Sequence, residues 1–182
     1  IDPLNSKDFD DAFGIEVNEK TTTISIYIAN VSYWLDVMDL WGSFSQRIST
    51  IYLPDRKRPM LPTMLSDALC SLIENQIRYA FTLDMVFDNE TNEFLEHKFT
   101  NSSIKIDKNF VYDTSEQENY EDYKILFEKV RKINRKYKYI DKVNDSHDVV
   151  AYLMIYMNYM CAKELKKHRR GIFRSAKLNN KF

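Results

Sequence analysis

Cysteine is scarce in this sequence, and its scarcity excludes a fold held by disulfide bonds. The 182-residue chain has only Cys70 and Cys161, and its three histidines, His97, His147 and His168, do not join them at the spacing of a zinc site. So few and so isolated cysteines are typical of proteins in a reducing compartment. We therefore expect an intracellular protein of the cytoplasm.

Long hydrophobic runs are also absent. No apolar stretch reaches the roughly 18 residues that a membrane helix requires, and we find neither a signal peptide nor a lipidation motif. The sequence has no low-complexity tract and no internal repeat. Because 44% of the residues are hydrophobic and 14% aromatic, we expect one packed domain without a membrane partner.

A large net charge is missing too, but the charges are unevenly distributed. The formal charge is -1, from 26 Lys+Arg against 27 Asp+Glu. Seven basic residues and the single acid Glu128 lie between Lys124 and Lys138, and eight basic residues with only Glu164 lie between Lys163 and Lys181. The acids gather elsewhere, mainly at the amino end and over residues 113–122.

Two β-hairpins are predicted from alternating β-rich segments. The first joins Ala12–Val17 to Thr23–Ala29 across a polar turn. The second surrounds the turn-forming residues 88–93, which separate two strand-like runs within residues 79–100.

Helices are predicted where apolar residues recur at three- and four-residue steps. The segments are Tyr33–Tyr52, Met64–Leu72 with Thr63 as its cap, Tyr120–Tyr139 and Val149–Leu165. Together with the hairpins they predict an α+β fold, in which helices pack on a mixed β-sheet.

The opening "IDPLNSKDFDDA" places four aspartates, Asp2, Asp8, Asp10 and Asp11, within eleven residues. Crowded carboxylates repel one another unless they share a cation. Hard ions such as Mg²⁺, or Mn²⁺ in its place, bind a few carboxylates and keep positions for water and phosphate oxygens. The cluster therefore favours a site for phosphoryl transfer.

Two other interpretations of the acidic cluster can be weighed. An EF-hand loop needs Gly at its sixth position and Glu at its twelfth, but counting from Asp2 gives Lys7 and Phe13, and counting from Asp8 gives Phe13 and Glu19. A solvated loop whose aspartates cap turns is compatible with the spacing, and the spacing alone leaves it open.

Several segments in order resemble a known family. "IDPLNSKDFDDA" is similar to the opening motif of the catalytic (RNB) domain of ribonucleases II and R, and "IYIANVSYWL", "RISTIYLPDRKRPMLPTMLSDALCSL", "VAYLMIYMN" and "GIFRS" are similar to its later segments. An ordered series of motifs is far more specific than any single motif. The chain thus resembles the amino-terminal part of an RNB domain, over residues 1–182.

The resemblance implies a processive exoribonuclease. Such an enzyme uses Mg²⁺ to hydrolyse single-stranded RNA from its 3′ end and releases nucleoside 5′-monophosphates. By position, Asp2, Asp8, Asp10 and Asp11 match the family's metal site, with Asp2 and Asp11 as preferred direct ligands. Asp10 and Asp8 match catalytic positions, and Asp10 is expected to orient the attacking water.

The resemblance also implies contacts to RNA. Tyr52 matches an aromatic residue that stacks on the 3′-terminal bases, although packing at a helix end is the alternative. Arg47 and Arg78 match arginines that contact phosphates, although such arginines often pair with nearby acids. Arg174 lies in a basic run that either lines an RNA channel or faces solvent.

The sequence departs from the family pattern at three positions. Asn30 stands where the family usually has Asp, and Ala151 and Tyr152 replace a pair of glutamates expected to support the site. The resemblance also implies that the carboxyl-terminal half of the domain and the flanking RNA-binding barrels lie outside these 182 residues. We therefore expect a fragment that begins at Ile1, is inactive alone, and belongs to a longer protein and to a possible larger RNA-decay complex. The alternative function is an RNA-binding or scaffold module that kept the fold and lost catalysis.

Overall fold

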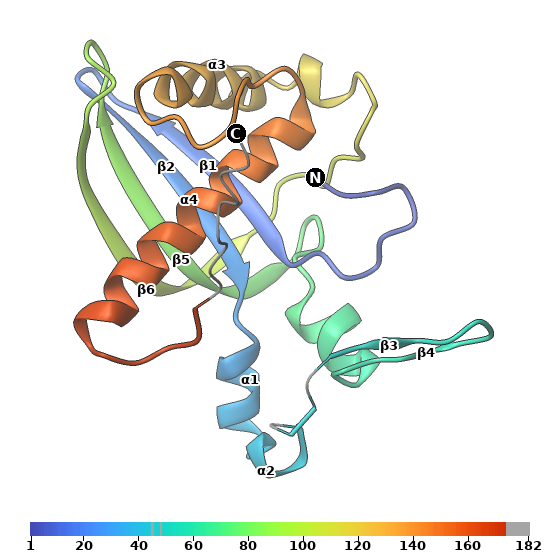
Figure 1. Cartoon of the computed structure of the whole chain (residues 1–182). Coiled ribbons are helices and arrows are strands. Elements are labelled where there is room, and N and C mark those ends of the chain that lie inside the picture. Colours follow the sequence, from blue (N-terminus) through green and yellow to red (C-terminus); the bar gives the residue numbers. More distant parts are fainter. Residues whose placement is uncertain (45, 48, 174–182) are drawn as a thin grey trace, which may run out of the picture.

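The computed structural model describes residues 1–173, with the exception of residues 45 and 48. Its centre is a four-stranded sheet in the order β1-β2-β5-β6 (Figure 1). The strands are β1 (Asp11–Val17), β2 (Thr21–Ala29), β5 (Ile77–Asp88) and β6 (Phe94–Lys105). Both predicted hairpins and the α+β class are confirmed, but all three pairings in this sheet are antiparallel, where a mixed sheet was expected.

The helices α3 (Glu121–Lys136) and α4 (Ser146–Lys167) cover one face of the sheet (Figure 1). They confirm the predictions made from the two amphipathic segments. Alternate residues of β2 and β5 meet their apolar faces, and the fully buried members are Ile24, Ile26, Leu83, Met85, Phe87, Val130, Ile133, Val149, Tyr152 and Leu153. Burial of this surface from water is the main force that holds the helices on the sheet.

The prediction of one helix over Tyr33–Tyr52 is wrong. The segment forms two short helices, α1 (Val31–Val37) and α2 (Trp41–Phe44), followed by strand β3 (Ile51–Tyr52). Asp39 has a φ of 51°, a left-handed conformation that ends a helix. The apolar pattern does not face a core here, since Trp41 and Ile51 are exposed; Ile48 lies outside the described residues.

The second predicted helix, over Met64–Leu72, is shorter than expected and starts differently. It is the π-helix η1 (Met64–Cys70), and the Thr63 side chain makes no capping hydrogen bond. Instead, the carbonyl of Pro62 accepts hydrogen bonds from the backbone of Leu65 and Ser66 at 2.8 and 3.0 Å. The Thr63 cap was therefore predicted wrongly, because Thr63 itself has helical backbone angles.

A narrow ribbon of β3 and β4 (Lys57–Arg58) extends away from the sheet and its helices (Figure 1). The remaining element is the short 3-10 helix η2 (Gln117–Asn119), which precedes α3. Among the described residues, no helix has the length and apolar character needed to cross a membrane.

Candidate functional site

The acidic loop, residues 2–11, is held at several points by distant parts of the chain. At its start, Asp2 forms a parallel bridge to Val111: its N–H donates to the Phe110 carbonyl, and its carbonyl accepts from the Tyr112 N–H, both at 3.0 Å. At its end, the Asp10 carbonyl accepts from the Ala29 N–H at 2.9 Å. The loop is therefore fixed to the sheet.

Ser71 and Leu72 hold the middle of the acidic loop. The Ser71 hydroxyl accepts a hydrogen bond from the Phe9 N–H at 2.9 Å and donates one to the Lys7 carbonyl at 3.1 Å. The Leu72 N–H donates to the Phe9 carbonyl at 2.9 Å. Because Ser71 is fully buried, these bonds are shielded from competition with water.

The four carboxylates of the loop lie close enough to influence one another. Partial burial raises the pKa of Asp10, and the charges of Asp8 and Asp2 raise it further. Burial raises the pKa of Asp11 to about 6; the α-amino group of Ile1 lowers it, while Asp2 and Asp10 raise it. The loop thus holds concentrated negative charge in a partly dehydrated place.

Asp11 has the most confined carboxylate. It lines a cavity of about 250 Å³ between β1, the segment 104–110 and the start of α3. Its Oδ2 atom is buried and has no hydrogen-bond partner among the described residues. Burial and the charges of Asp11 and Asp2 also raise the pKa of Tyr112 to about 12, so this hydroxyl stays protonated beside them.

A buried carboxylate oxygen without a donor is a suitable ligand for a cation, and a set of carboxylates fits Mg²⁺. Among the residues that the structure describes, however, no three His, Cys, Asp or Glu side chains come close enough together to hold a metal ion. The structure therefore brings Asp2, Asp8, Asp10 and Asp11 into one neighbourhood without placing them at ligand distance.

Asn30 has a structural role that the family pattern does not indicate. Its Oδ1 atom caps α1 by accepting from the Tyr33 N–H at 3.1 Å and from the Ser32 hydroxyl at 2.9 Å. Its Nδ2 atom donates to Asn101 Oδ1 at 2.9 Å on β6. The amide group thus uses both its acceptor and its donor, which a carboxylate cannot do.

The other departures from the family pattern lie on α4. Ala151 is exposed, whereas Tyr152 is buried in the core and donates its hydroxyl hydrogen bond to the Tyr137 carbonyl at 3.0 Å. Tyr152 therefore fastens α4 to the end of α3. In this chain residue 152 therefore contributes to core packing.

The predicted RNA-binding residues lie in different surroundings. Tyr52 is 78% exposed on the β3–β4 ribbon, so it does not pack at a helix end. Arg47 is exposed, stacks over Phe44 at 4.8 Å, and makes a long contact of 3.5 Å to the Met60 carbonyl. Arg174 lies outside the described residues.

Arg78 is occupied by the backbone. Its guanidinium donates to the carbonyls of Ser71 at 2.8 Å, Ala68 at 3.0 Å and Ile77 at 2.9 Å. Two of these carbonyls lie at the end of η1, where helical partners are lacking. Arg78 therefore holds the turn that carries Ser71, and its contact with the acidic loop is indirect.

Sequence reasoning missed three residues of this region, Ser71, Tyr112 and Asn109. Asn109 accepts from the Glu74 N–H at 2.6 Å and donates to the Leu72 carbonyl at 3.0 Å, so it holds the far side of the same turn. A single Ser, Tyr or Asn has no spacing pattern, and no local signal in the sequence identifies these positions.

Known proteins share both sequence and fold with this chain. The RNB domain family model matches residues 1–121. The ribonuclease R of Aquifex aeolicus is 43% identical over 94 residues, which cover 50% of this chain and 13% of that protein. That of Thermotoga maritima is 31% identical over 136 residues, covering 69% of this chain and 19% of that protein. The match thus spans less than a fifth of these relatives.

Solved structures agree on the fold. The apo form of Mycoplasma genitalium RNase R superposes with a TM-score of 0.75 at 24% identity, covering 92% of this chain and 32% of that chain. The Dss1 exoribonuclease of Candida glabrata superposes with a TM-score of 0.72 at 17% identity, covering 93% of this chain and 28% of that chain. Since the family model covers well over half of the sequence, the chain belongs to the RNB-domain family of ribonucleases II and R.

Proposed function

We propose that the acidic loop binds Mg²⁺ and forms part of the active site of a processive 3′-to-5′ exoribonuclease. The substrate would be single-stranded RNA and the products nucleoside 5′-monophosphates. One observation carries the proposal most: a buried, unpartnered carboxylate oxygen of Asp11 lies beside three further aspartates on an anchored loop. Membership of the RNB family, and a structure of M. genitalium RNase R with single-stranded RNA, support it.

Asp2 and Asp11 would hold the metal, with Asp8 and Asp10 beside them; Mn²⁺ would fit the same ligands. The chemistry that such an ion would supply is polarisation of the scissile phosphate and a lower pKa of a coordinated water. Asp10, whose pKa is raised by burial and by its acidic neighbours, would orient that water for in-line attack. The backbone anchors at Ser71 and Val111 would keep the carboxylates in place during the reaction.

RNA would reach the site past the β3–β4 ribbon. Tyr52 offers an exposed ring on which any base can stack, since every base has a π-face. Arg47 is exposed, and its guanidinium would exchange the long contact to the Met60 carbonyl for a phosphate. Arg78, with three donors used on carbonyls, is proposed to act on the RNA only through the turn that it holds.

A second function, RNA binding without catalysis, is favoured by one observation. Asn30 and Tyr152 stand where the family pattern has acids, and both are built into the structure by hydrogen bonds. The yeast pseudonuclease Ssd1 has a related fold, with a TM-score of 0.54 at 13% identity. The presence of all four loop aspartates favours the enzyme.

The deciding experiment incubates 5′-labelled single-stranded RNA with Mg²⁺ and compares the parent with Asp10→Asn. It is run on this chain alone, where we expect little turnover, and on the chain extended by the rest of an RNB domain with its barrels. In the extended protein we expect stepwise shortening that Asp10→Asn abolishes while binding persists. Binding without shortening in the extended parent would support the second function.

Two further expectations stay predictions. An intracellular location and participation in an RNA-decay complex are compatible with a ribonuclease, and fractionation of the native protein would test both. The proposed division of the chain, with residues 1–182 as one amino-terminal part of an RNB domain, is tested by limited proteolysis, which should leave a single core fragment.

A further inference from the structure

A basic hollow lies where α3 ends and the chain turns toward α4. It encloses about 440 Å³ and is lined by Arg131, Asn134, Arg135, Lys138, Asp141, Lys142, Val143 and Asn144. Its lining has four cationic side chains and one carboxylate, a net charge of +3 in a chain whose formal charge is -1. Positive charge is therefore gathered in a concave surface, where its potential is strongest.

Acidic neighbours neutralise only part of this charge. Arg131 pairs with Glu128 at 2.9 Å, and Lys138 pairs with Asp141 at 3.0 Å. Arg135 and Lys142 form no ion pair within the part of the chain that the structure describes. The hydrogen bond and charge of Lys138, with the charge of Lys142, lower the pKa of Asp141, so both lysines lie near this carboxylate.

The turn that carries the lysines is rigidly held. The buried Asn134 side chain donates to the Ile140 carbonyl at 3.1 Å and accepts from the Tyr139 N–H at 3.2 Å. Val143 is buried in the core, and the Asn144 N–H donates to Asp148 Oδ2 at 2.7 Å. The charges therefore project from a preorganised backbone, which lowers the entropy cost of binding a ligand.

Helix stability explains only part of the cluster. Arg135 lies in the last turn of α3, where a cation complements the helix dipole. Lys138 and Lys142 lie in the turn after the last residue of α3. Together with Arg131 and Arg135 they line one hollow, a surface that suits an anionic ligand.

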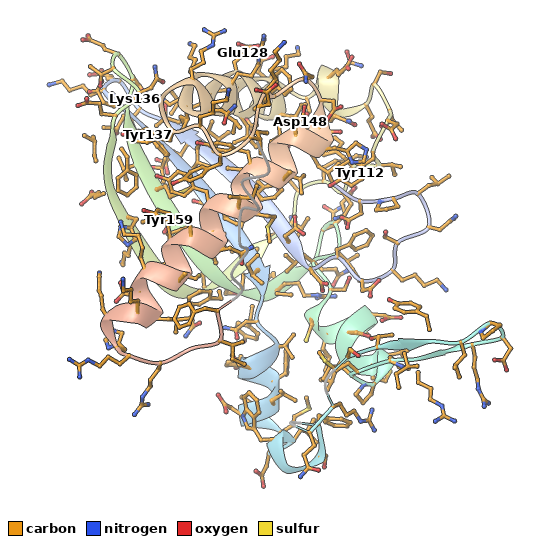
Figure 2. All side chains as sticks on the ribbon, viewed as in Figure 1. Tyr112, Glu128, Lys136, Tyr137, Asp148 and Tyr159 are labelled. Atoms are coloured by element: carbon orange, nitrogen blue, oxygen red, sulfur yellow. The ribbon has the colours of Figure 1, made fainter. Side chains whose placement is uncertain are left out.

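The Arg135 end of the hollow lies away from the acidic loop. Tyr123, near the start of α3, lines the cavity of Asp11, whereas Arg135 lies twelve residues further along the helix, which corresponds to about 18 Å. Figure 2 shows Lys136 and Tyr137, which follow Arg135, at the opposite end of the helix layer from Tyr112, whereas the Asn144 side of the hollow lies next to Asp148.

We propose that the basic hollow is a second binding site for the phosphate backbone of single-stranded RNA, outside the acidic loop. The proposal rests on the proposed RNA substrate for its choice of polyanion. Contacts to phosphates would be independent of sequence, because lysine and arginine neutralise the backbone and release its counterions. The hollow would thus hold RNA whose end occupies the acidic loop.

The test measures binding of a short labelled single-stranded RNA to the whole chain in EDTA, so that cleavage has no part in it. The double variant Arg135→Ala/Lys142→Ala is compared with Lys124→Ala/Lys132→Ala. Both remove two exposed cations, and the control pair lies on α3 outside the hollow. Thermal melts verify that both variants remain folded.

We expect the hollow variant to bind roughly 10-fold or more weakly at low salt, and its slope of log affinity against log salt to fall by about 1.4, from two contacts of about 0.7 each. The control should lose less than about threefold. Equal losses in both variants, no RNA binding by the parent, or equally tight binding of polyglutamate would overturn the proposal. This test reads binding in EDTA, whereas the catalytic proposal is tested by RNA shortening in Mg²⁺, so a failure of the catalytic proposal is distinguishable from a failure of this one.

Discussion

The Ser71 hydroxyl and the Phe9 N–H form a hydrogen bond of 2.9 Å across 62 residues of sequence. The same hydroxyl donates to the Lys7 carbonyl at 3.1 Å, so one buried side chain fixes the acidic loop from both sides. Arg78 in turn holds the carbonyl of Ser71 at 2.8 Å. The position of the aspartates therefore depends on a residue with no acidic or basic chemistry of its own.

Ser71→Ala should loosen the acidic loop. The substitution leaves the Phe9 N–H and the Lys7 carbonyl without their partner, and we expect the free energy of unfolding to fall by about 1 to 3 kcal/mol. Urea denaturation measures this loss, with the exposed Ser43→Ala as the control. A variant as stable as the parent would show that the loop is held without Ser71.

Asp11→Asn should stabilise the chain in EDTA at pH 7. The pKa of Asp11 in the folded state is about 6, above the value of about 3.9 for an unperturbed aspartate. The stability that Asp11 contributes is thus fully present below pH 4 and is lost as the pH rises through 6. We expect a gain of about 1 to 3 kcal/mol at pH 7 that vanishes near pH 4.

The same Asp11→Asn variant should respond less to Mg²⁺. In the parent, added Mg²⁺ should raise the melting temperature, because a ligand that binds only the folded state stabilises it. Thermal melts with and without Mg²⁺ measure the rise in melting temperature for the parent and the variant. Asp36→Asn, which is remote from the acidic loop in sequence, is the control. An identical response of parent and Asp11→Asn would exclude Asp11 as a metal ligand.

Asn30→Asp should destabilise the chain, although it restores the residue of the family pattern. The carboxylate can still cap α1 through the Tyr33 N–H, but it cannot donate to Asn101 Oδ1. Because Asn30 is buried, we expect a loss of about 1 to 3 kcal/mol at pH 7. The double change Asn30→Asp/Asn101→Ser should recover part of it, and a stable single variant would contradict this account.

Tyr52→Ala should weaken RNA binding and leave stability unchanged. The ring is 78% exposed, so its removal costs the fold little, whereas base stacking on an aromatic ring is worth about 1 to 3 kcal/mol. We expect an affinity roughly 5- to 150-fold lower in a binding titration. Tyr52→Phe keeps the ring and should bind RNA like the parent. An equal loss of affinity in Tyr52→Ala and Tyr52→Phe would assign the effect to the hydroxyl and contradict base stacking.

Asp88→Ala should reduce stability in a pH-dependent manner. Hydrogen bonds from the Thr91 backbone and hydroxyl lower the pKa of Asp88 at the β5–β6 turn, and the Glu90 N–H adds another. A lowered pKa stabilises the fold above the unperturbed value of about 3.9, and this contribution is lost as the pH falls through the lowered pKa. The melting temperatures of parent and variant should therefore differ at pH 7 and converge in acid.

Much of the fold could be predicted from the sequence, since its elements follow local patterns. Alternation predicted the two hairpins, and the apolar repeats predicted α3 and α4, because each had a core to face. The repeat over residues 33–52 had no such core. The chain breaks it at Asp39, whose left-handed backbone is not a property that periodicity can reveal.

The sequence by itself determined the acidic motif, the family and the main strands and helices, because spacing and periodicity are local properties of the chain. Only the tertiary structure decided that Ser71 anchors the acidic loop, that Asn30 joins α1 to β6, and that the lysines after α3 converge on one hollow. These relationships depend on hydrogen bonds and charges between residues that folding brings together. A local sequence pattern does not specify which residues from distant parts of the chain will come into contact with it.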